Sequence, residues 1–85
     1  KKVFFLHFIY PRKSFFLKKF NNKIFKKIKL KKKIYFFKKE NSYVVKSKNS
    51  DARIAMLLFY FKSMGDFEKK YDSLKKHLNK IDSNF

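Results

Sequence analysis

The sequence lacks cysteine and tryptophan altogether, and it contains a single glycine and a single proline. Without cysteine the chain forms neither a disulfide nor a thiolate-ligated zinc site. The single glycine, Gly65, excludes a glycine-rich loop that brings backbone amides close to a phosphate. Long apolar runs are also missing. The stretch over residues 3–10 is far shorter than the ~20 residues of a membrane-spanning helix, and we expect a buried strand or an anchor there, with a remnant of a targeting segment as the alternative.

Acidic residues are scarce. Asp and Glu number 6 against 24 Lys and Arg, which gives a net charge of +18 over 85 residues. Because self-repulsion at this density opposes compaction, we expect a polyanionic partner, either nucleic acid or an anionic membrane surface. Only Arg12 and Arg53 are arginine, and lysine is a point charge that suits phosphate and reads bases poorly. The composition therefore favours contact with a phosphate backbone over sequence readout.

Aromatic residues, in contrast, are abundant, with 13 Phe and 5 Tyr. A disordered basic tail is poor in aromatics, so we expect much of the chain to be ordered, at least when bound. The length allows one small domain, whose core is marginal by itself. Partners are therefore expected to supply part of the stability.

The chain divides into an extended apolar and basic segment (residues 1–13), a lysine-rich amphipathic arm and linker (14–48), and a helical module (49–85). In the second segment Ser14 is a candidate N-cap. Apolar residues then recur at i, i+4 opposite a lysine-rich side, which predicts a basic amphipathic helix over residues 14–28. The recurring residues are Phe16, Phe20, Ile24 and Ile28. Residues 27–37 alternate in part between lysine and apolar residues, which leaves helix and strand both open.

The third segment has the strongest apolar period. Ser50 and Asp51 precede it, and an acid in the first turn complements the helix dipole. Gly65 interrupts the period, so residues 65–68 indicate either a kink or a break with Asp66 as a new cap. The series comprises Ile54, Leu57, Leu58, Phe61, Met64, Phe67, Tyr71, Leu74, Leu78 and Ile81. The sequence predicts an all-α fold, in which a basic extension with an amphipathic helix precedes a helical hairpin or one long kinked helix.

No residue pattern indicates catalysis. His7 and His77 are far apart in the sequence, with no carboxylate placed beside either, and we expect surface or interface histidines. Asp66 and Glu68 precede two lysines, as helix-face charges do. We therefore expect no enzymatic activity, no metal or other cofactor, and no small-molecule substrate.

The lysines gather in short runs, which in most proteins form a solvated face. At this net charge we interpret them as phosphate contacts, which make binding steeply dependent on salt. The runs predicted to bind RNA contain Lys18, Lys19, Lys26, Lys27, Lys31, Lys32 and Lys33. Aromatic residues between the lysines can stack on unpaired bases, but packing against neighbouring protein is the interpretation that we favour from the sequence.

Residues 49–81 resemble small-subunit ribosomal protein fifteen, particularly its mitochondrial members. In that family a polar loop with a Ser leads to an acid that opens a long helix, and an Ile and a small residue follow. Here the corresponding order is Asn49, Ser50, Asp51, Ala52, Arg53, Ile54 and Ala55. Lysines, an Asp, a Ser in a tight turn, more basic residues and a second helix come next in the family. The matching residues here are Lys69, Lys70, Asp72, Ser73, Lys75, Lys76, Leu78 and Ile81.

The resemblance implies binding to a helical junction of ribosomal RNA. Asn49, Ser50 and Arg53 are then expected near one strand crossing. Contacts to the minor groove and phosphates are expected from Asp72, Ser73, Lys75 and Lys76. The chain departs from the family by lacking the histidines between the Asp and the Ser, and by carrying Gly65 where the family helix is unbroken.

The sequence therefore predicts a structural constituent of an organellar ribosome in the mitochondrial matrix, with ribosomal RNA and neighbouring ribosomal proteins as partners. A plastid ribosome is not distinguished from a mitochondrial one. The alternative is an accessory subunit of a mitochondrial inner-membrane complex, with residues 3–10 and the helix over residues 14–28 at the lipid interface. A free-standing nucleic-acid-binding protein is the third possibility.

Overall fold

The computed structural model describes residues 2–19, 23–47 and 52–85. These residues form β1 (Val3–Ile9), β2 (Phe15–Leu17), α1 (Lys23–Lys26), β3 (Lys32–Phe36), β4 (Ser42–Val44), β5 (Ala55–Phe61) and α2 (Met64–Asp82). The predicted all-α fold is wrong, because the described part of the chain is a mixed α/β structure with two antiparallel sheets.

The larger sheet places β5 between β1 and β3. The register of β1 against β5 runs from Val3 opposite Phe61 to Ile9 opposite Ala55, and β3 pairs with the other edge of β5. Because β1 and β3 are both antiparallel to β5, they are parallel to each other, and α1 lies in the connection between them. This is a split β-α-β arrangement. The short strands β2 and β4 pair separately as a two-stranded ribbon.

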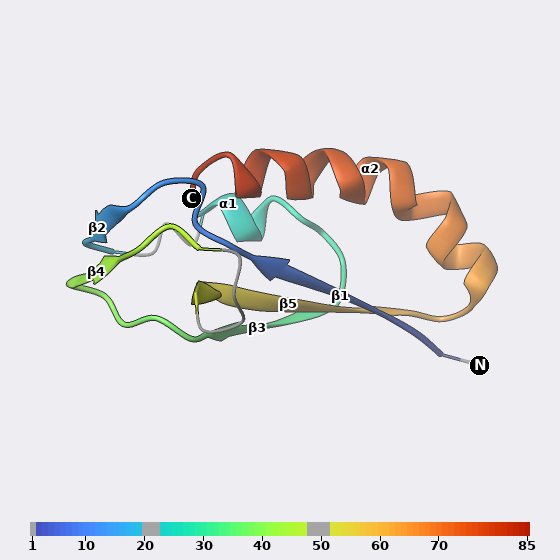
Figure 1. Ribbon diagram of the computed structural model, residues 1–85. Helices are drawn as coiled ribbons and strands as arrows, with labels where there is room; N and C mark the ends of the chain where they lie inside the picture. The colour runs from blue at the N-terminus through green and yellow to red at the C-terminus, as the bar shows by residue number, and fades with distance from the viewer. Residues whose placement is uncertain (1, 20–22, 48–51) are drawn as a thin grey trace.

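The helices lie on one side of the larger sheet. Figure 1 shows α2 running across this side, with α1 beneath it near the β2–β4 ribbon. Neither helix covers the opposite side of the sheet. The molecule thus has a helix layer over one sheet layer, and one sheet face is left without a covering element among the described residues.

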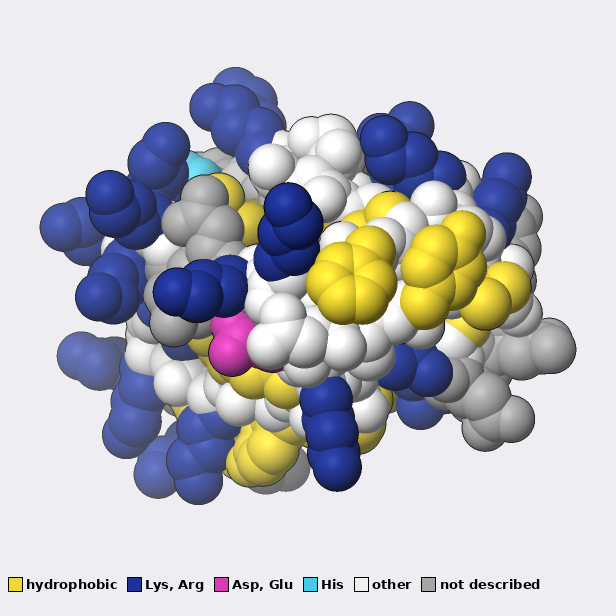
Figure 2. All heavy atoms as spheres, turned by 90° about the vertical axis from the view of Figure 1, so that its left-hand side faces the viewer, with side chains coloured by type: hydrophobic (Ala, Val, Ile, Leu, Met, Phe, Trp, Pro, Cys, Tyr) yellow, Lys and Arg dark blue, Asp and Glu magenta, His cyan; other side chains and the backbone are white. Residues whose placement is uncertain are grey.

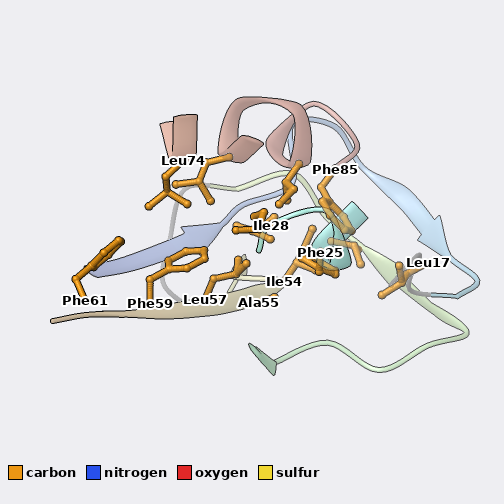
Figure 3. Close-up of a cluster of buried hydrophobic side chains, with 14 residues drawn as sticks. Leu17, Phe25, Ile28, Ile54, Ala55, Leu57, Phe59, Phe61, Leu74 and Phe85 are labelled. Carbon is orange, nitrogen blue, oxygen red and sulfur yellow. The ribbon is translucent and has the colours of Figure 1, made fainter. Parts of the chain in front are cut away.

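The hydrophobic core fills the space between α2 and the sheet. From the helix come Leu74, Leu78 and Ile81, at the i, i+4, i+7 spacing of one helix face. They meet alternate residues of β5, of which Leu57 and Phe59 are fully buried (Figure 3). Phe25, Ile28, Val44 and Leu17 extend the same cluster toward α1 and the ribbon. Full burial of each large apolar side chain stabilises the fold by about 1.5–3 kcal/mol.

Residues 55–61 form a strand where the sequence predicted a helix. All seven residues of β5 are apolar or aromatic, and their burial alternates strictly along the strand. A continuous apolar run matches the helical spacing as well as the strand spacing, so the period alone could not distinguish them. Pairing with β1 on one edge and β3 on the other decides the conformation.

The long helix begins at Met64, not near Ser50, and the residues from Lys48 to Asp51 lie outside the described ranges. Ser63 is extended and caps the helix, because its Oγ accepts a hydrogen bond from the Asp66 backbone N–H at 3.1 Å. Gly65 is the second residue of α2, so no helix is kinked or broken at residues 65–68, and the cap is Ser63 and not Asp66. From there α2 continues unbroken to Asp82, so the helical hairpin and the long kinked helix from residue 50 are both wrong.

The predicted amphipathic helix over residues 14–28 is also wrong. The described residues of this range form strand β2 and the four-residue helix α1, whereas Phe20 lies outside them. The Ser14 Oγ accepts a hydrogen bond from the Lys46 backbone N–H at 2.8 Å and caps no helix. The undecided stretch over residues 27–37 contains strand β3, and the N-terminal stretch is extended as β1.

Candidate nucleic-acid interface

The residues predicted to bind RNA do not converge on one surface. Lys18 and Lys19 follow β2, Lys26 ends α1 and Lys27 follows it, and all four are exposed. Asn49 and Ser50 lie outside the described residues. The basic side chains therefore surround the fold, and Figure 2 shows Lys and Arg side chains projecting around the outline of the face near the β2–β4 ribbon.

The strand geometry of β3 divides the run of Lys31, Lys32 and Lys33. Successive side chains of a strand point to opposite faces. Lys31 and Lys33 are exposed, whereas Lys32 lies opposite the buried Phe59 on the side of the core. The Lys32 Nζ donates a hydrogen bond to the Ile28 carbonyl at 2.6 Å, and burial lowers the pKa of this amine from 10.5. We conclude that Lys32 serves the fold, and that Lys31 and Lys33 remain available to a partner.

The other predicted contacts lie on the outer side of α2. The predicted contacts Asp72, Ser73, Lys75 and Lys76 are exposed residues in the middle of the helix, so the tight turn that the resemblance implied does not exist.

Four of the six acidic residues belong to α2, beside five lysines. The helix is therefore nearly neutral, and almost all of the net positive charge lies on the rest of the chain.

Arg53 packs against the N-terminal strand and does not extend freely into solvent. Its guanidinium carbon lies 4.1 Å from the centre of the Phe8 ring, and its Nε donates a hydrogen bond to the Tyr10 hydroxyl at 3.1 Å. A guanidinium over an aromatic face is an attractive cation–π arrangement. Arg53 thus places a fixed cation at one end of the uncovered side of the sheet.

That uncovered side, here called the open face, is the largest feature that the sequence analysis missed. Residues directly opposite in an antiparallel pair share a face. The cross-strand partners Phe4–Tyr60, Leu6–Leu58 and Phe8–Met56 therefore lie together across β1 and β5. On the other edge of β5, Lys33 lies opposite Leu58 and Tyr35 opposite Met56, while the Lys31 carbonyl accepts a hydrogen bond from the Tyr60 N–H. The open face comprises Phe4, Leu6, Phe8, Lys31, Lys33, Tyr35, Met56, Leu58 and Tyr60.

The open face is apolar, aromatic and bordered by cations. Phe4, Leu6 and Tyr35 retain 58%, 51% and 44% of their surface exposed. The Phe4 and Tyr60 rings meet edge to face with their centres 5.3 Å apart, and the Lys31 Nζ lies 5.8 Å from the centre of the Tyr60 ring. None of the residues of β1, β3 or β5 is acidic. A ligand on this face therefore meets aromatic rings and positive charge together.

A cleft of about 280 Å³ adjoins the Tyr60 end of the open face. Lysines from four parts of the chain line it, beside Leu30, Tyr60, Phe61 and Asp66. The lining lysines are Lys2, Lys29, Lys31, Lys62 and Lys70. The single carboxylate, Asp66, is paired with Lys70 at 3.0 Å, and the hydrogen bond from Lys70 lowers the pKa of this carboxyl. The cleft is thus strongly positive and large enough for a phosphate group.

The β2–β4 ribbon carries a second exposed aromatic pair. Phe16 lies opposite Tyr43 in the register, and the two side chains are 52% and 64% exposed. The neighbouring Val45 is also exposed. Figure 2 shows hydrophobic side chains grouped on this side of the molecule. The ribbon pair is smaller than the open face.

The histidines differ from the expectation in one respect. His7 does have a carboxylate beside it, because its Nε2 lies 2.9 Å from the Asp82 Oδ1 at the end of α2. The two residues are 75 positions apart, so only the fold brings them together.

Among the described residues no group of three or more His, Asp or Glu side chains could hold a metal ion. In the same part of the chain no helix combines the length and apolarity needed to cross a bilayer.

The sequence signal that could have revealed the open face is the alternation of apolar and polar residues that a half-buried strand shows. This signal is missing because both faces of β1 and β5 are largely apolar, so the burial of successive residues changes along the strands while their hydrophobicity does not.

Comparison with known protein families, with curated proteins and with solved structures finds no match to this chain.

Proposed function

We propose that this chain is an RNA-binding structural protein whose lysines contact the phosphate backbone, and that it serves as a constituent of an organellar, mitochondrial ribosome. The observation that carries the proposal is the distribution of charge. The helix α2 is nearly neutral, whereas the rest of the chain carries almost all of the charge of +18, mostly on lysines that lie outside the strands. A phosphate backbone is the common cellular partner that neutralises such a surface.

The proposal concerns RNA contact through the sheet side and no longer through a helical hairpin. The described part of the segment that resembles ribosomal protein fifteen contains a strand followed by one helix. This is not the helical fold that the resemblance implied, so the resemblance does not support RNA binding. What supports RNA binding is the lysine distribution, together with Lys31 and Lys33 beside an exposed aromatic surface.

The membrane alternative has lost one of its two elements. It required a basic amphipathic helix over residues 14–28, where the structure has β2 and the short helix α1. Its other element, residues 3–10, contains a strand paired along its whole length with β5. The experiments therefore compare binding to RNA with binding to an anionic lipid surface.

The test is a salt titration of RNA binding with matched variants. A fluorescently labelled helical-junction RNA is titrated with the chain between about 50 and 200 mM salt, where each phosphate contact steepens the dependence of log K on log salt. We expect Lys31→Gln with Lys33→Gln to flatten the slope by about 1 for each lysine that no longer neutralises a phosphate. The control, Lys75→Gln with Lys76→Gln, removes the same charge from α2 and should leave most of the slope intact.

Two outcomes contradict the proposal. In the titration, absence of RNA binding at about 50 mM salt would overturn phosphate contact. In an organellar extract, we expect high salt without detergent to release the chain, and the chain to sediment with the small ribosomal subunit at low salt. A requirement for detergent, or co-sedimentation only with vesicles that contain anionic lipid, would favour the membrane alternative.

A further inference from the structure

Among the residues that the structure describes, no element covers the open face, although it carries apolar side chains of the kind that a fold normally buries. Phe4, Leu6 and Tyr35 are each more than two-fifths exposed, and the adjacent residues of β5 are apolar as well. Exposed apolar surface of this extent marks an interaction site. The question is therefore which partner the chemistry of the face selects.

We infer that the open face is a stacking platform for unpaired nucleotides of single-stranded RNA, with the flanking lysines holding the phosphates. The inference rests on the proposed function and deepens it by naming the surface and the class of RNA. Aromatic residues exposed on an antiparallel sheet can stack on successive bases, and stacking tolerates any sequence because every base has a π face. The sparse arginine content agrees with binding that does not read base edges.

The geometry of the face suits two or three bases. Phe4 of β1 and Tyr60 of β5 lie opposite each other at one end, and at the other end Phe8 of β1 and Tyr35 of β3 lie on either side of Met56 of β5. The four-residue separation of Phe4 and Phe8 along β1 corresponds to about 13 Å at ~3.3 Å per residue. Two or three bases is also the number that sheet platforms commonly stack.

Cations stand at both ends of this path. Arg53 lies over Phe8 at one end, and the lysine-lined cleft adjoins Tyr60 at the other. Lys31 belongs both to the cleft and to the open face, with its amine over the Tyr60 ring. A base that stacks on Tyr60 would displace this flexible amine toward the adjacent phosphate. The open face thus offers rings for bases, with cations at both ends for phosphates.

Charge decides against the other occupants of an apolar face. A second copy of the chain would bring another +18 charges and would oppose Lys31 and Lys33 with their own equivalents. A protein partner would have to be strongly acidic, and it would offer carboxylates without the flat rings that match Phe4, Tyr35 and Tyr60. Single-stranded RNA supplies both flat apolar rings and negative charge at short, regular intervals.

The experiment compares single-stranded oligouridine with an RNA hairpin stem of equal charge, using variants that remove rings without changing charge. We expect Phe4→Leu and Tyr60→Leu each to weaken oligouridine binding by about tenfold, which corresponds to the loss of one stacked base. Hairpin binding and the salt slope should not change. The matched control, Tyr43→Leu, removes an exposed ring from the β2–β4 ribbon and should leave oligouridine affinity unaltered.

Ultraviolet cross-linking of the unaltered chain to a 5-bromouridine oligonucleotide gives a second measurement that does not depend on the folding of any variant. Cross-links are expected at Phe4, Tyr35 or Tyr60. Cross-links confined to Tyr43 or to Tyr71 of α2, together with unchanged affinity of the Phe4 and Tyr60 variants, would overturn the platform while leaving phosphate contact in place.

The remaining outcomes are also decisive. Binding of neither RNA would remove the proposed function and the platform together. Dimerisation that is abolished in Leu6→Lys would assign the open face to a second copy, and binding to anionic vesicles that is abolished in the same variant would assign it to a lipid surface.

Discussion

The Nε2 of His7 on β1 lies 2.9 Å from the Oδ1 of Asp82 in the last turn of α2. This contact ties the first strand of the chain to the end of its long helix, and it is the polar counterpart of the apolar packing between the two layers. Since both side chains are partly exposed, the contact is not a buried ion pair, and its contribution to the stability of the fold is modest.

We expect Asp82→Asn and His7→Ala each to lower the free energy of unfolding by about 0.5–1.5 kcal/mol, the usual net contribution of one hydrogen bond. A double-mutant cycle measured by urea denaturation isolates the coupling between them. A coupling energy near zero would show that the two side chains do not interact in solution.

The two faces of the sheet differ in their contribution to stability. Leu57 of β5 is fully buried against α2, whereas Leu6 of β1 is exposed on the open face. We expect Leu57→Ala to lower the free energy of unfolding by about 2–5 kcal/mol because it leaves a cavity, and Leu6→Ala to change it by about 0.5 kcal/mol or less. Equal losses in urea denaturation would mean that the open face is covered in the isolated chain.

The start of α2 depends on the side chain of Ser63, whose Oγ satisfies a backbone N–H that has no partner within the helix. We expect Ser63→Ala to lower stability by about 1 kcal/mol, and Ser63→Asp to retain most of it, since aspartate also caps helices well. The measurement is thermal denaturation followed by circular dichroism. A helix that began near Ser50 would place residue 63 in its interior, and Ser63→Ala would then be neutral or stabilising.

The pH dependence of stability should report on Lys32. Burial lowers its pKa in the folded chain below 10.5, so the unfolded chain binds more protons in the interval between the lowered value and the ordinary one. Stability therefore rises with pH through this interval, and the gain disappears as the pH falls through the folded-state pKa. Urea denaturation at a series of alkaline pH values should show this rise.

Two variants separate Lys32 from the general effect of lysine deprotonation, which also relieves charge repulsion at high pH. Lys33→Met removes a neighbouring exposed amine and should keep the rise, whereas Lys32→Met should reduce it. A rise of the same size in both variants would mean that Lys32 is solvated in the folded chain.

The long-range arrangement accounts for most of what sequence analysis missed. The helical period from Met64 to Ile81 corresponds to α2, because polar residues alternate there with an apolar stripe. The same period continued into residues 54–61 only because those positions are almost all apolar. Likewise, Phe16, Ile24 and Ile28 are spaced as in one helix face, yet they belong to a strand, a short helix and the turn after it.

For the same reason, only part of the candidate site could be derived from the sequence. The excess of lysine is evident from composition, but the position of each lysine in the fold is not. Lys31 and Lys33 face outward and Lys32 faces inward because a strand alternates, and the alternation matters only once β3 pairs with β5. The aromatic surface required the pairing of Phe4 with Tyr60, which lie far apart in the chain.

The sequence alone determined the excess of positive charge, the absence of thiol chemistry and the helical tendency of the last twenty or so residues, because these are properties of composition or of local spacing. Only the tertiary structure decided that residues 55–61 are a central strand, which ring-bearing side chains stay uncovered, and that His7 meets Asp82. These features depend on contacts between residues far apart in the chain, and local spacing carries no information about which distant segments will pair.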